Sequence, residues 1–482
     1  MSIAVILDCG ATNVRAIAIN DKGEIVASHY IANETLQNGT QHVWDFQQIW
    51  LKLVDCCKTV TAQINVQDIV AVAVTTFGVD GAPFDKNGQQ IYPIISWKCS
   101  RTAPVMEQVS KELHRAELYI ANGIGDYSFN TLFKLKWLKD NEPEVYCSMD
   151  KWVFISSMIN HKLTGEFTTD RTMAGTSMMT NLETGDWDST ALEYLSLTKE
   201  HFPKMVNAGE VVGKIKEDIA FLLNIPKNTP IVSAGHDTQF ALFGSGAKEN
   251  EVFLSSGTWE ILMARAPKPK LNPEDLAKGM TTELDSKHGL YNPAIQWLSS
   301  AVVEWVANTY FLDVIGQSNK YAVIISEGEN AEIGCNGVRF DPSFLLDSNK
   351  NGHGALTGLS INTNRGEIYR AALEGLAVKL AVSLQNLSNS CGIETDGLMV
   401  VGGGSKNTLW NQIRADVIGK QIKIVDQPES TVVGAAMFAF SGANIFASSE
   451  HAQEAMKPSY KTVTPSQNSA IYKKLFEEEL NA

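Results

Sequence analysis

Asp237 offers a carboxylate in a setting that suits catalysis, the run Gly235-His236-Asp237-Thr238. An apolar stretch, 230–234, precedes this run, and a second one, 240–243, follows it. That order predicts a carboxylate where a strand ends and a helix begins, facing a crevice of an α/β sheet. One well-placed carboxylate is what a general base requires when a hydroxyl attacks a phosphoryl group. The structural alternative is that Asp237 or Thr238 only caps the helix.

Asp8 begins a second polar segment, which has the composition of an anion-binding turn. It ends the apolar run 3–7 and leads into Gly10, Thr12, Asn13 and Arg15. A carboxylate at this place can hold Mg²⁺, mostly through water, because Mg²⁺ gives up its hydration shell reluctantly. Gly10 lets the chain pass close to a phosphate, and the residues after it add donors. The alternative is an ordinary hairpin in which Asp8 caps the turn.

Two further small-residue turns could approach a nucleotide. Ser256-Gly257-Thr258 lies between the apolar runs 251–255 and 259–264, so its N–H groups could reach a phosphate, although a plain hairpin has the same pattern. Gly402, Gly403 and Gly404 follow the apolar run 398–401, and Ser405-Lys406-Asn407 comes next. This spacing matches neither a P-loop nor a dinucleotide fingerprint, and an adenosine lying on the glycine backbone fits it. A tight packing turn is the alternative.

The elements that must position these residues form a repeated pattern. Apolar runs and turns predict strands at 3–8, 14–19, 24–28 and 69–75, with a helix at 45–64. A strand, a small Gly/Thr turn and a strand recur at 251–264, and the order strand, loop, helix, strand runs from 398 to 425. The fold class is therefore α/β, and we expect a duplicated unit with domains at 1–246 and 247–482.

Length and composition restrict the partners. The chain has 482 residues, enough for two domains, and a net charge of −14, which disfavours nucleic acid and anionic membranes. No apolar run is long enough to span a membrane, and the N-terminal run is a buried strand, without the basic start of a signal peptide. The seven scattered cysteines indicate reduced thiols, so we expect a cytoplasmic protein; a homo-oligomer stays open.

Two longer stretches resemble the signatures of the FGGY carbohydrate kinases. One is 129–141, FNTLFKLKWLKDN; the other runs from GALTGL at 354–359, through Glu367, to AALE at 371–374. The resemblance covers nearly the whole chain. It implies duplicated actin/hexokinase/Hsp70-like (ribonuclease H-like) ATPase domains, with a catalytic cleft between them that takes ATP and Mg²⁺.

The resemblance also implies roles for individual residues. Asp237 would be the base and Asp8 the carboxylate on the metal side. Thr258 would contact phosphate, and Gln296 would reach the nucleotide. The remaining nucleotide contacts would come from the first hairpin and the glycine loop: Gly10, Thr12, Asn13, Arg15, Gly402, Gly403, Gly404 and Asn407.

Within the family, runs such as 75–81 and 95–99 are most similar to the members that phosphorylate L-fuculose to L-fuculose 1-phosphate, with L-rhamnulose as the alternative substrate. Asp80, Gly81, Trp97 and His236 would line the sugar site with Asp237. Glycerol kinases carry Arg-Glu and xylulokinases Met-His where this chain has Val79-Asp80. Trp97 could equally be a wall of the crevice. An actin/Hsp70-like ATPase switch is the alternative from another class, and it would not need Asp237 or the Asp80–Trp97 region.

Overall fold

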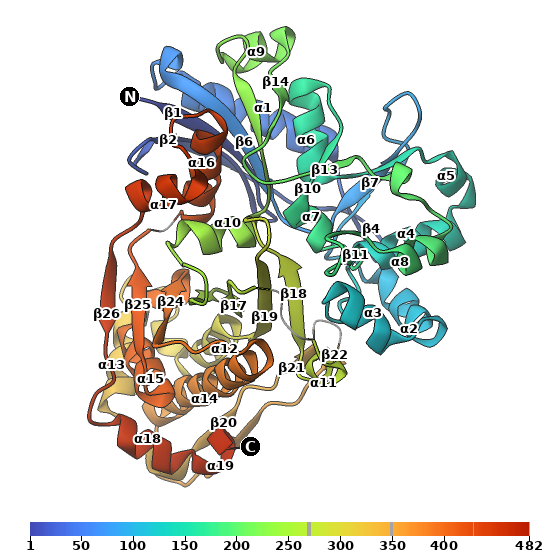
Figure 1. The fold of residues 1–482 in the computed structure, drawn as a ribbon. Helices are drawn as coiled ribbons and strands as arrows, with labels where there is room; N and C mark the ends of the chain where they lie inside the picture. The colour runs from blue at the N-terminus through green and yellow to red at the C-terminus, as the bar shows by residue number, and fades with distance from the viewer. Residues whose placement is uncertain (268–270, 348–349, 428, 482) are drawn as a thin grey trace.

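The structure is a computed structural model, and it describes residues 1–267, 271–347, 350–427 and 429–481. It has two lobes, each built around a β-sheet (Figure 1). The N-terminal sheet has the order β14 (Val211–Lys214), β15 (Pro230–His236), β6 (Ile69–Thr76), β1 (Ile3–Cys9), β2 (Asn13–Asn20) and β3 (Ile25–Ala32). Strands β1, β2 and β3 form the predicted antiparallel meander. Strand β6 runs parallel to β1, and β15 runs parallel to β6.

The C-terminal sheet repeats this arrangement. Its order is β18 (Met280–Leu284), β19 (Tyr291–Leu298), β17 (Trp259–Ala264), β16 (Val252–Ser256), β24 (Gly397–Val401), β25 (Gln421–Val425) and β26 (Tyr460–Val463). Strands β16, β17 and β19 are antiparallel, like β1, β2 and β3, while β24 and β25 are parallel to β16, like β6 and β15 to β1. The predicted duplicated α/β fold is therefore confirmed.

The sequence explains the main elements locally. All seven residues of β1 are buried, as an apolar strand covered on both faces requires. Helix α1 (Phe46–Thr61) begins where Asp45 accepts a hydrogen bond from the Gln48 N–H, and it buries one apolar face. In the other lobe, α14 (Arg365–Cys391) begins with a capping box, in which Asn364 and Glu367 each accept from the other's backbone N–H.

Two helices meet between the sheets. Helix α10 (Asp237–Gly244) follows β15, and α16 (Ser430–Gly442) follows β25. They cross so closely that a Cβ on Gly434 would lie 2.0 Å from the Phe240 carbonyl oxygen. Although α16 comes late in the chain, it packs on β1, β6 and β15 of the N-terminal sheet (Figure 1). The C-terminal stretch of the chain thus contributes to the core of both lobes, and the boundary at 246/247 stays a proposal.

The remaining helices surround the two sheets. In the N-terminal lobe they are α2 (Ala103–Glu112), α3 (Arg115–Asn122), α4 (Thr131–Asn141), α5 (Pro143–Ser148), α6 (Ile155–Thr164), α7 (Arg171–Gly175), α8 (Ser189–Leu195) and α9 (Glu217–Leu223). In the C-terminal lobe they are α11 (Pro273–Ala277), α12 (Ser300–Tyr310), α13 (Lys320–Asn330), α15 (Thr408–Ile418), α17 (Ser449–Met456), α18 (Ser469–Leu475) and α19 (Glu477–Asn481).

The short strands lie outside the two main sheets: β4 (Leu36–Asn38), β5 (Gln41–Trp44), β7 (Gly81–Phe84), β8 (Ile94–Ile95), β9 (Lys151–Phe154), β10 (Thr168–Asp170), β11 (Thr180–Asn181), β12 (Asp186–Trp187), β13 (Lys204–Val206), β20 (Arg339–Asp341), β21 (Leu345–Asp347), β22 (Lys350–Asn351) and β23 (Ala355–Thr357).

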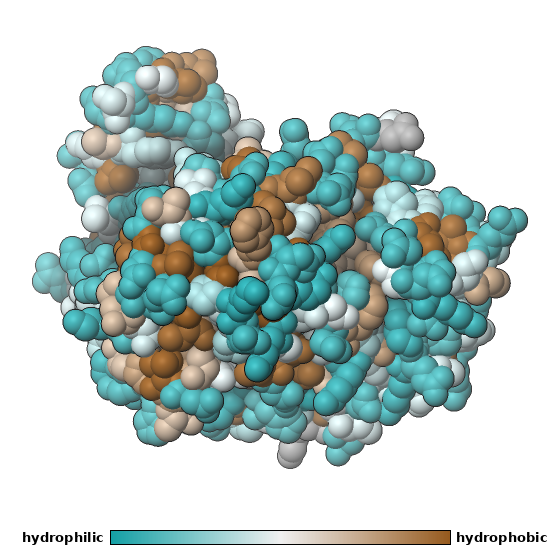
Figure 2. Space-filling view, turned by 90° about the horizontal axis from the view of Figure 1, so that it is seen from above, coloured by the Kyte–Doolittle hydropathy of each residue, from teal (hydrophilic) through white to brown (hydrophobic). Residues whose placement is uncertain are grey.

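The surface and the cysteines agree with the composition. On the face shown in Figure 2, hydrophilic side chains predominate and hydrophobic ones are interspersed among them in small groups. Over the described parts of the chain, no helix combines the length and hydropathy that crossing a membrane requires. All seven cysteines are free thiols in the structure, and five of them are buried.

Candidate active site

Asp237 is the first residue of α10, where strand β15 becomes a helix at the junction of the two lobes. The N-cap is His236, and neither Asp237 nor Thr238 caps the helix, so the capping alternative is wrong. The Asp237 side chain is 31% exposed; its Oδ1 accepts a hydrogen bond from the Thr238 hydroxyl at 3.1 Å and lies 3.4 Å from His236 Nε2. The carboxylate is therefore available at the position where a base is expected.

A buried network fixes the backbone just before Asp237. The Thr172 hydroxyl accepts from the His236 N–H at 2.9 Å and donates to Asp170 at 2.6 Å. Asp170 also accepts from the Ser233 hydroxyl at 2.6 Å. A Cβ on Gly235 would come within 2.3 Å of the Thr172 hydroxyl, so only glycine fits there. These contacts hold the turn that presents His236 and Asp237.

Asp8 lies at the end of β1 and is 2% exposed. Arg15 Nε donates to Asp8 Oδ2 at 2.8 Å, and Arg15 Nη1 reaches Glu429 Oε2 at 2.5 Å. Burial raises the pKa of Asp8 to about 6; Arg15 opposes this shift and the nearby Asp237 adds to it. Arg15 thus neutralises the carboxylate and links the first hairpin to Glu429, which precedes α16.

The turn after Asp8 is open to a ligand. The Gly10 N–H donates to the Asn13 carbonyl at 2.9 Å, which closes the turn, and Asn33 braces it by donating to the Gly10 carbonyl at 2.9 Å. Thr12 at the tip is exposed. The turn is therefore closed by its own hydrogen bonds with Thr12 exposed at its tip, and its contact with phosphate stays a prediction.

A cavity of about 590 Å³ opens between the lobes beside Asp237. Its walls come from both halves of the chain, with Trp97, Phe129 and His236 on one side and Ile261, Met263 and Glu283 on the other. Trp97 and Phe129 meet edge to face, and Phe129 stacks on Tyr127. The cavity joins an aromatic wall to a few polar groups, as small-molecule sites commonly do.

The predicted sugar residues are only partly in this cavity. Trp97 and His236 line it, but Asp80, Gly81 and Asp237 do not; Asp237 lies between two lining residues, His236 and Thr238. Asp80 is fully buried in the wall, where Oδ2 accepts from Trp44 Nε1 at 2.7 Å and from the Trp97 N–H at 3.0 Å. Its Oδ1 forms an ion pair with the equally buried Lys134. The expectation that Asp80 touches the sugar is therefore corrected: its oxygens bond to Trp44, to the backbone of Trp97 and to Lys134, inside the wall of the cavity.

Gly81 is also a packing position. A Cβ there would lie 2.7 Å from the Val153 carbonyl oxygen and 2.8 Å from Trp152 Nε1, because β7 pairs closely with β9. Gly81 thus serves the wall behind the cavity.

Lys134 lies 54 residues from Asp80 in the sequence, so residue spacing could not predict that the two side chains form an ion pair.

A second cavity of about 670 Å³ lies along the glycine loop. Its lining residues include Thr258, Tyr321, Tyr369, Gly403, Gly404 and Asn407. A Cβ on Gly403 would meet nothing within 4 Å, whereas Cβ atoms on Gly402 and Gly404 would strike Ser256 at 2.6 and 2.2 Å. Gly402 and Gly404 are therefore required by packing against the second hairpin, and Gly403 has open space before it.

Asn407 caps α15, since its Oδ1 accepts from the Trp410 N–H at 3.1 Å, and its Nδ2 donates to the Tyr369 hydroxyl at 2.8 Å. Its side chain thus shapes the glycine-loop cavity through Tyr369. Gln296 does not lie in this cavity. It stands on β19 in the wall of the 590 Å³ cavity, so the expected place at the nucleotide is corrected to the neighbourhood of Trp97 and His236.

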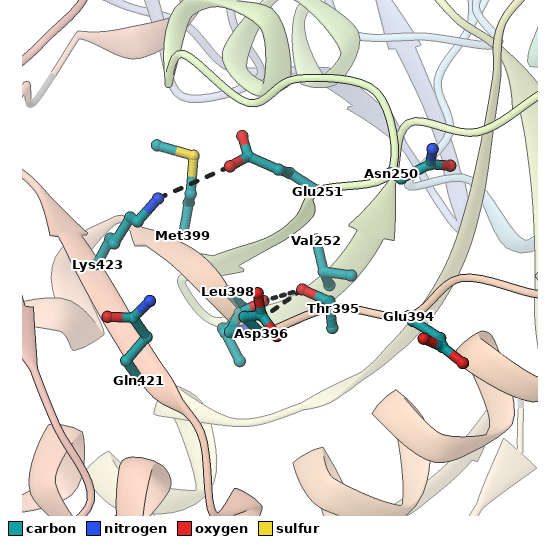
Figure 3. A pocket seen from close by; sticks show the side chains of 11 residues that line it. Asn250, Glu251, Val252, Glu394, Thr395, Asp396, Leu398, Met399, Gln421 and Lys423 are labelled. Atoms are coloured by element: carbon teal, nitrogen blue, oxygen red, sulfur yellow. Dashed lines mark hydrogen bonds and ion pairs between the residues drawn. The ribbon is translucent and has the colours of Figure 1, made fainter.

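A third hollow, of about 230 Å³, lies at the N-terminal ends of β16 and β24. Glu251 and Lys423 point toward each other across it at 3.7 Å, and Glu394 and Asp396 add two more carboxylates (Figure 3). Its net negative charge makes it a poor place for phosphates or ATP, and none of the predicted site residues lines it.

The residues around Asp8 suit a magnesium ion carried by a nucleotide better than a resident metal. Among the residues that the structure describes, no three acidic, histidine or cysteine side chains come together to form a metal site. Asp8 is a buried carboxylate beside the first hairpin that is paired with Arg15 and has Asp237 nearby. Mg²⁺ typically takes one or two carboxylates and completes its shell with water and phosphate oxygens, so the donor set fits this mode.

Two family models cover almost all of these elements. Residues 3–244 match the N-terminal domain of the FGGY family of carbohydrate kinases, and residues 252–443 match the C-terminal domain. This chain belongs to the FGGY family of carbohydrate kinases. A relative named L-fuculokinase, from Haemophilus influenzae, is 51% identical over 474 residues, covering 96% of this chain and 100% of the relative. A rhamnulokinase from Bacteroides thetaiotaomicron is 27% identical and covers 89% of each chain.

The solved structures agree on the FGGY fold. A xylulose kinase from Rhodospirillum rubrum superposes with a TM-score of 0.90 at 20% identity, covering 99% of this chain and 97% of that one. At this identity the likeness establishes the architecture alone. As an FGGY kinase, the chain uses ATP to phosphorylate a carbohydrate.

Proposed function

We propose that this kinase transfers the γ-phosphoryl group of ATP to the C1 hydroxyl of L-fuculose, giving L-fuculose 1-phosphate and ADP. The supporting observation is the 51% identity to a Haemophilus influenzae L-fuculokinase along the whole length of that enzyme, against 27% to a rhamnulokinase. A cavity of about 590 Å³ with an aromatic wall suits a sugar that carries a methyl group and several hydroxyls.

In the proposed reaction, Asp237 accepts the proton of the attacking C1 hydroxyl as the new phosphorus–oxygen bond forms and ADP leaves. Its place at the N-terminus of α10, beside the sugar cavity, supports this role. The N–H groups of Gly10 and Gly257 already bond to the Asn13 and Trp259 carbonyls, so the exposed Thr12 and the cavity-lining Thr258 would contact the phosphates in these turns. The Gly403 face of the glycine loop would take the adenosine. Asp8 would hold Mg²⁺, which supplies charge neutralisation at the phosphates when bound.

Release of ADP, measured with a coupled enzyme assay, tests the proposal. L-Fuculose, L-rhamnulose, D-xylulose, D-ribulose and glycerol are compared at matched concentrations. We expect L-fuculose to have the highest kcat/KM. A higher kcat/KM for L-rhamnulose would show that L-rhamnulose, the alternative, is the substrate. ATP hydrolysis independent of all five compounds would contradict a sugar kinase.

A further inference from the structure

Glu283, which no part of the sequence pattern singled out, reaches across the cleft to the residues that flank Asp237. It lies on β18 of the C-terminal sheet and lines the sugar cavity. Its Oε2 is 3.2 Å from His236 Nδ1 and accepts a hydrogen bond from Gln239 Nε2. One carboxylate of the C-terminal lobe therefore contacts the side chains one residue before and two residues after the proposed base.

The strand that carries Glu283 is attached firmly to the N-terminal lobe. The Thr282 N–H donates to the Gly123 carbonyl at 2.7 Å, and the Gly125 N–H donates to the Thr281 hydroxyl at 3.2 Å. Gly175 of α7 lies so close that a Cβ there would be 2.9 Å from the Leu284 nitrogen. These backbone contacts on either side fix where the Glu283 side chain enters the cavity.

The carboxylate has a partner on only part of its surface. The contacts to His236 and Gln239 both use Oε2, and the Glu283 side chain is 17% exposed where it lines the cavity. Burial alone would lower the pKa of His236, but Glu283, and then Asp237, raise it above its usual value. His236 Nε2 also lies 3.4 Å from Asp237 Oδ1, so both ring nitrogens face carboxylates, and the atom left to meet a sugar hydroxyl is the second carboxylate oxygen of Glu283, a good acceptor.

We propose that Glu283 is a sugar-binding residue. Its Oε1 accepts a hydrogen bond from a hydroxyl of the ketose other than the reacting C1 hydroxyl, while its Oε2 holds His236 in place. This inference rests on the proposed ketose kinase function and names a specificity contact of the same site. Glu283 belongs to the lobe opposite Trp97, so residues on both sides of the cleft would contact the sugar.

Steady-state kinetics of Glu283→Gln test the proposal. Losing a charge-assisted hydrogen bond should raise KM for the ketose about 10- to 100-fold, while KM for ATP stays within about twofold of the native value. Glu251→Gln is the matched control, because Glu251 is also a glutamate at the C-terminal sheet with two partners, Lys423 and the Lys248 N–H, and it lines the third hollow rather than the cavity. Glu283→Asp keeps the charge and should fall between native and Glu283→Gln; it also provides a readout if Glu283→Gln folds poorly.

Ketose analogues that each lack one hydroxyl separate a direct contact from a structural role. One analogue should bind the native enzyme about 10- to 100-fold more weakly than the parent sugar, yet bind Glu283→Gln with little further loss. An unchanged ketose KM in Glu283→Gln, an equal rise in KM for ATP, or analogue losses that match those of the native enzyme would overturn the contact. If the native enzyme prefers another ketose to L-fuculose, the proposed substrate fails, and the same series with the preferred ketose still judges Glu283.

Discussion

Asp237 and His236 occupy the turn from β15 into α10, and the turn is fixed from behind by Thr172 and Asp170. Because His236 is the N-cap and lacks a side-chain capping bond, the Asp237 carboxylate has no structural duty at the helix start. Its charge near the positive end of α10 is compatible with the helix dipole, and its exposure leaves it free to take a proton.

Asp237→Asn should therefore keep the fold and lose the chemistry. The amide can still bind a hydroxyl but cannot accept its proton, so kcat should fall at least about 100- to 10,000-fold, with KM for the sugar little changed. The measurement is steady-state kinetics paired with a thermal melt, where we expect nearly the native melting temperature. A folded variant with near-native kcat would falsify the role of Asp237 as the base.

The buried carboxylate of Asp8 should destabilise the folded, ligand-free protein. Its pKa in the folded protein is about 6, against an ordinary value of 3.8. Protonation of Asp8 favours the folded state. This contribution to the free energy of unfolding is fully present below pH 3.8 and is lost as the pH rises through about 6. At pH 8, removing this buried charge with Asp8→Asn should stabilise the ligand-free protein by on the order of 1–3 kcal/mol while turnover collapses.

The gap in melting temperature between Asp8→Asn and the native protein should narrow between pH 8 and pH 5, where the native carboxyl takes up its proton. Differential scanning calorimetry at the two pH values measures this. A variant that melts below the native protein at pH 8 would show that the pairing of Asp8 with Arg15 outweighs the cost of burial.

Asp80 belongs to the wall behind the sugar cavity. Asp80→Asn would leave the Lys134 ammonium fully buried without its carboxylate, which typically costs about 3–5 kcal/mol. Urea unfolding should show this loss, and adding Lys134→Met to the same chain should recover a large part of it, since the pair is then gone rather than broken. An unfolding midpoint equal to that of the native protein would mean that the ion pair carries no net stability.

Among the elements, the crossing of α10 and α16 joins the two lobes through glycine. Gly434 and Gly244 face each other, and each would bring a Cβ within 2.0 Å of a backbone oxygen of the other helix. The close approach puts α16, from late in the chain, against the N-terminal sheet, and α10 carries Asp237 at its first position.

Gly434→Ala should be destabilising, although alanine favours a helix by about 1 kcal/mol over glycine. The added methyl group forces the helices apart, at an expected cost of about 1–3 kcal/mol, and moves Asp237 relative to the cavity, so kcat should fall as well. Urea unfolding and kinetics measure both effects. Ser441→Ala on the same helix, at a partly exposed site, is the control; equal behaviour of the two variants would contradict the close-packing account.

The sequence predicted the elements well because their signals are local. Apolar runs ended by small turns located β1, β2, β16, β17 and β24 to within a residue or two, and helical spacing located α1 and α15. The sequence failed where the deciding contact is distant along the chain. The residues near Asp80 in the sequence do not predict its ion pair with Lys134. Likewise, the pattern of β18 does not predict that Glu283 lines the cavity. Placing Gln296 correctly required knowing on which side of the C-terminal sheet each cavity opens.

For the whole molecule, the duplication explains why the proposed active site lies between the lobes. Each copy contributes one hairpin turn and one helix that starts after a parallel strand, and the two helices pack against each other between the sheets. The sugar cavity draws its walls from both copies, and the glycine-loop cavity lies in the C-terminal one. Because the net charge of the chain is −14, we expect ATP binding to rely on backbone donors and on charge carried in with ATP rather than on a basic surface.

The most direct test of the whole account is the phosphorus NMR spectrum of the product formed from L-fuculose and ATP. In L-fuculose only C1 is a CH₂OH group, so a phosphate placed there couples to two protons and its resonance is a triplet. We predict that triplet with the native enzyme, together with ADP, and no phosphate ester above background with Asp237→Asn. A doublet, which marks transfer to a CH–OH carbon, or no sugar phosphate from the native enzyme, would contradict the account.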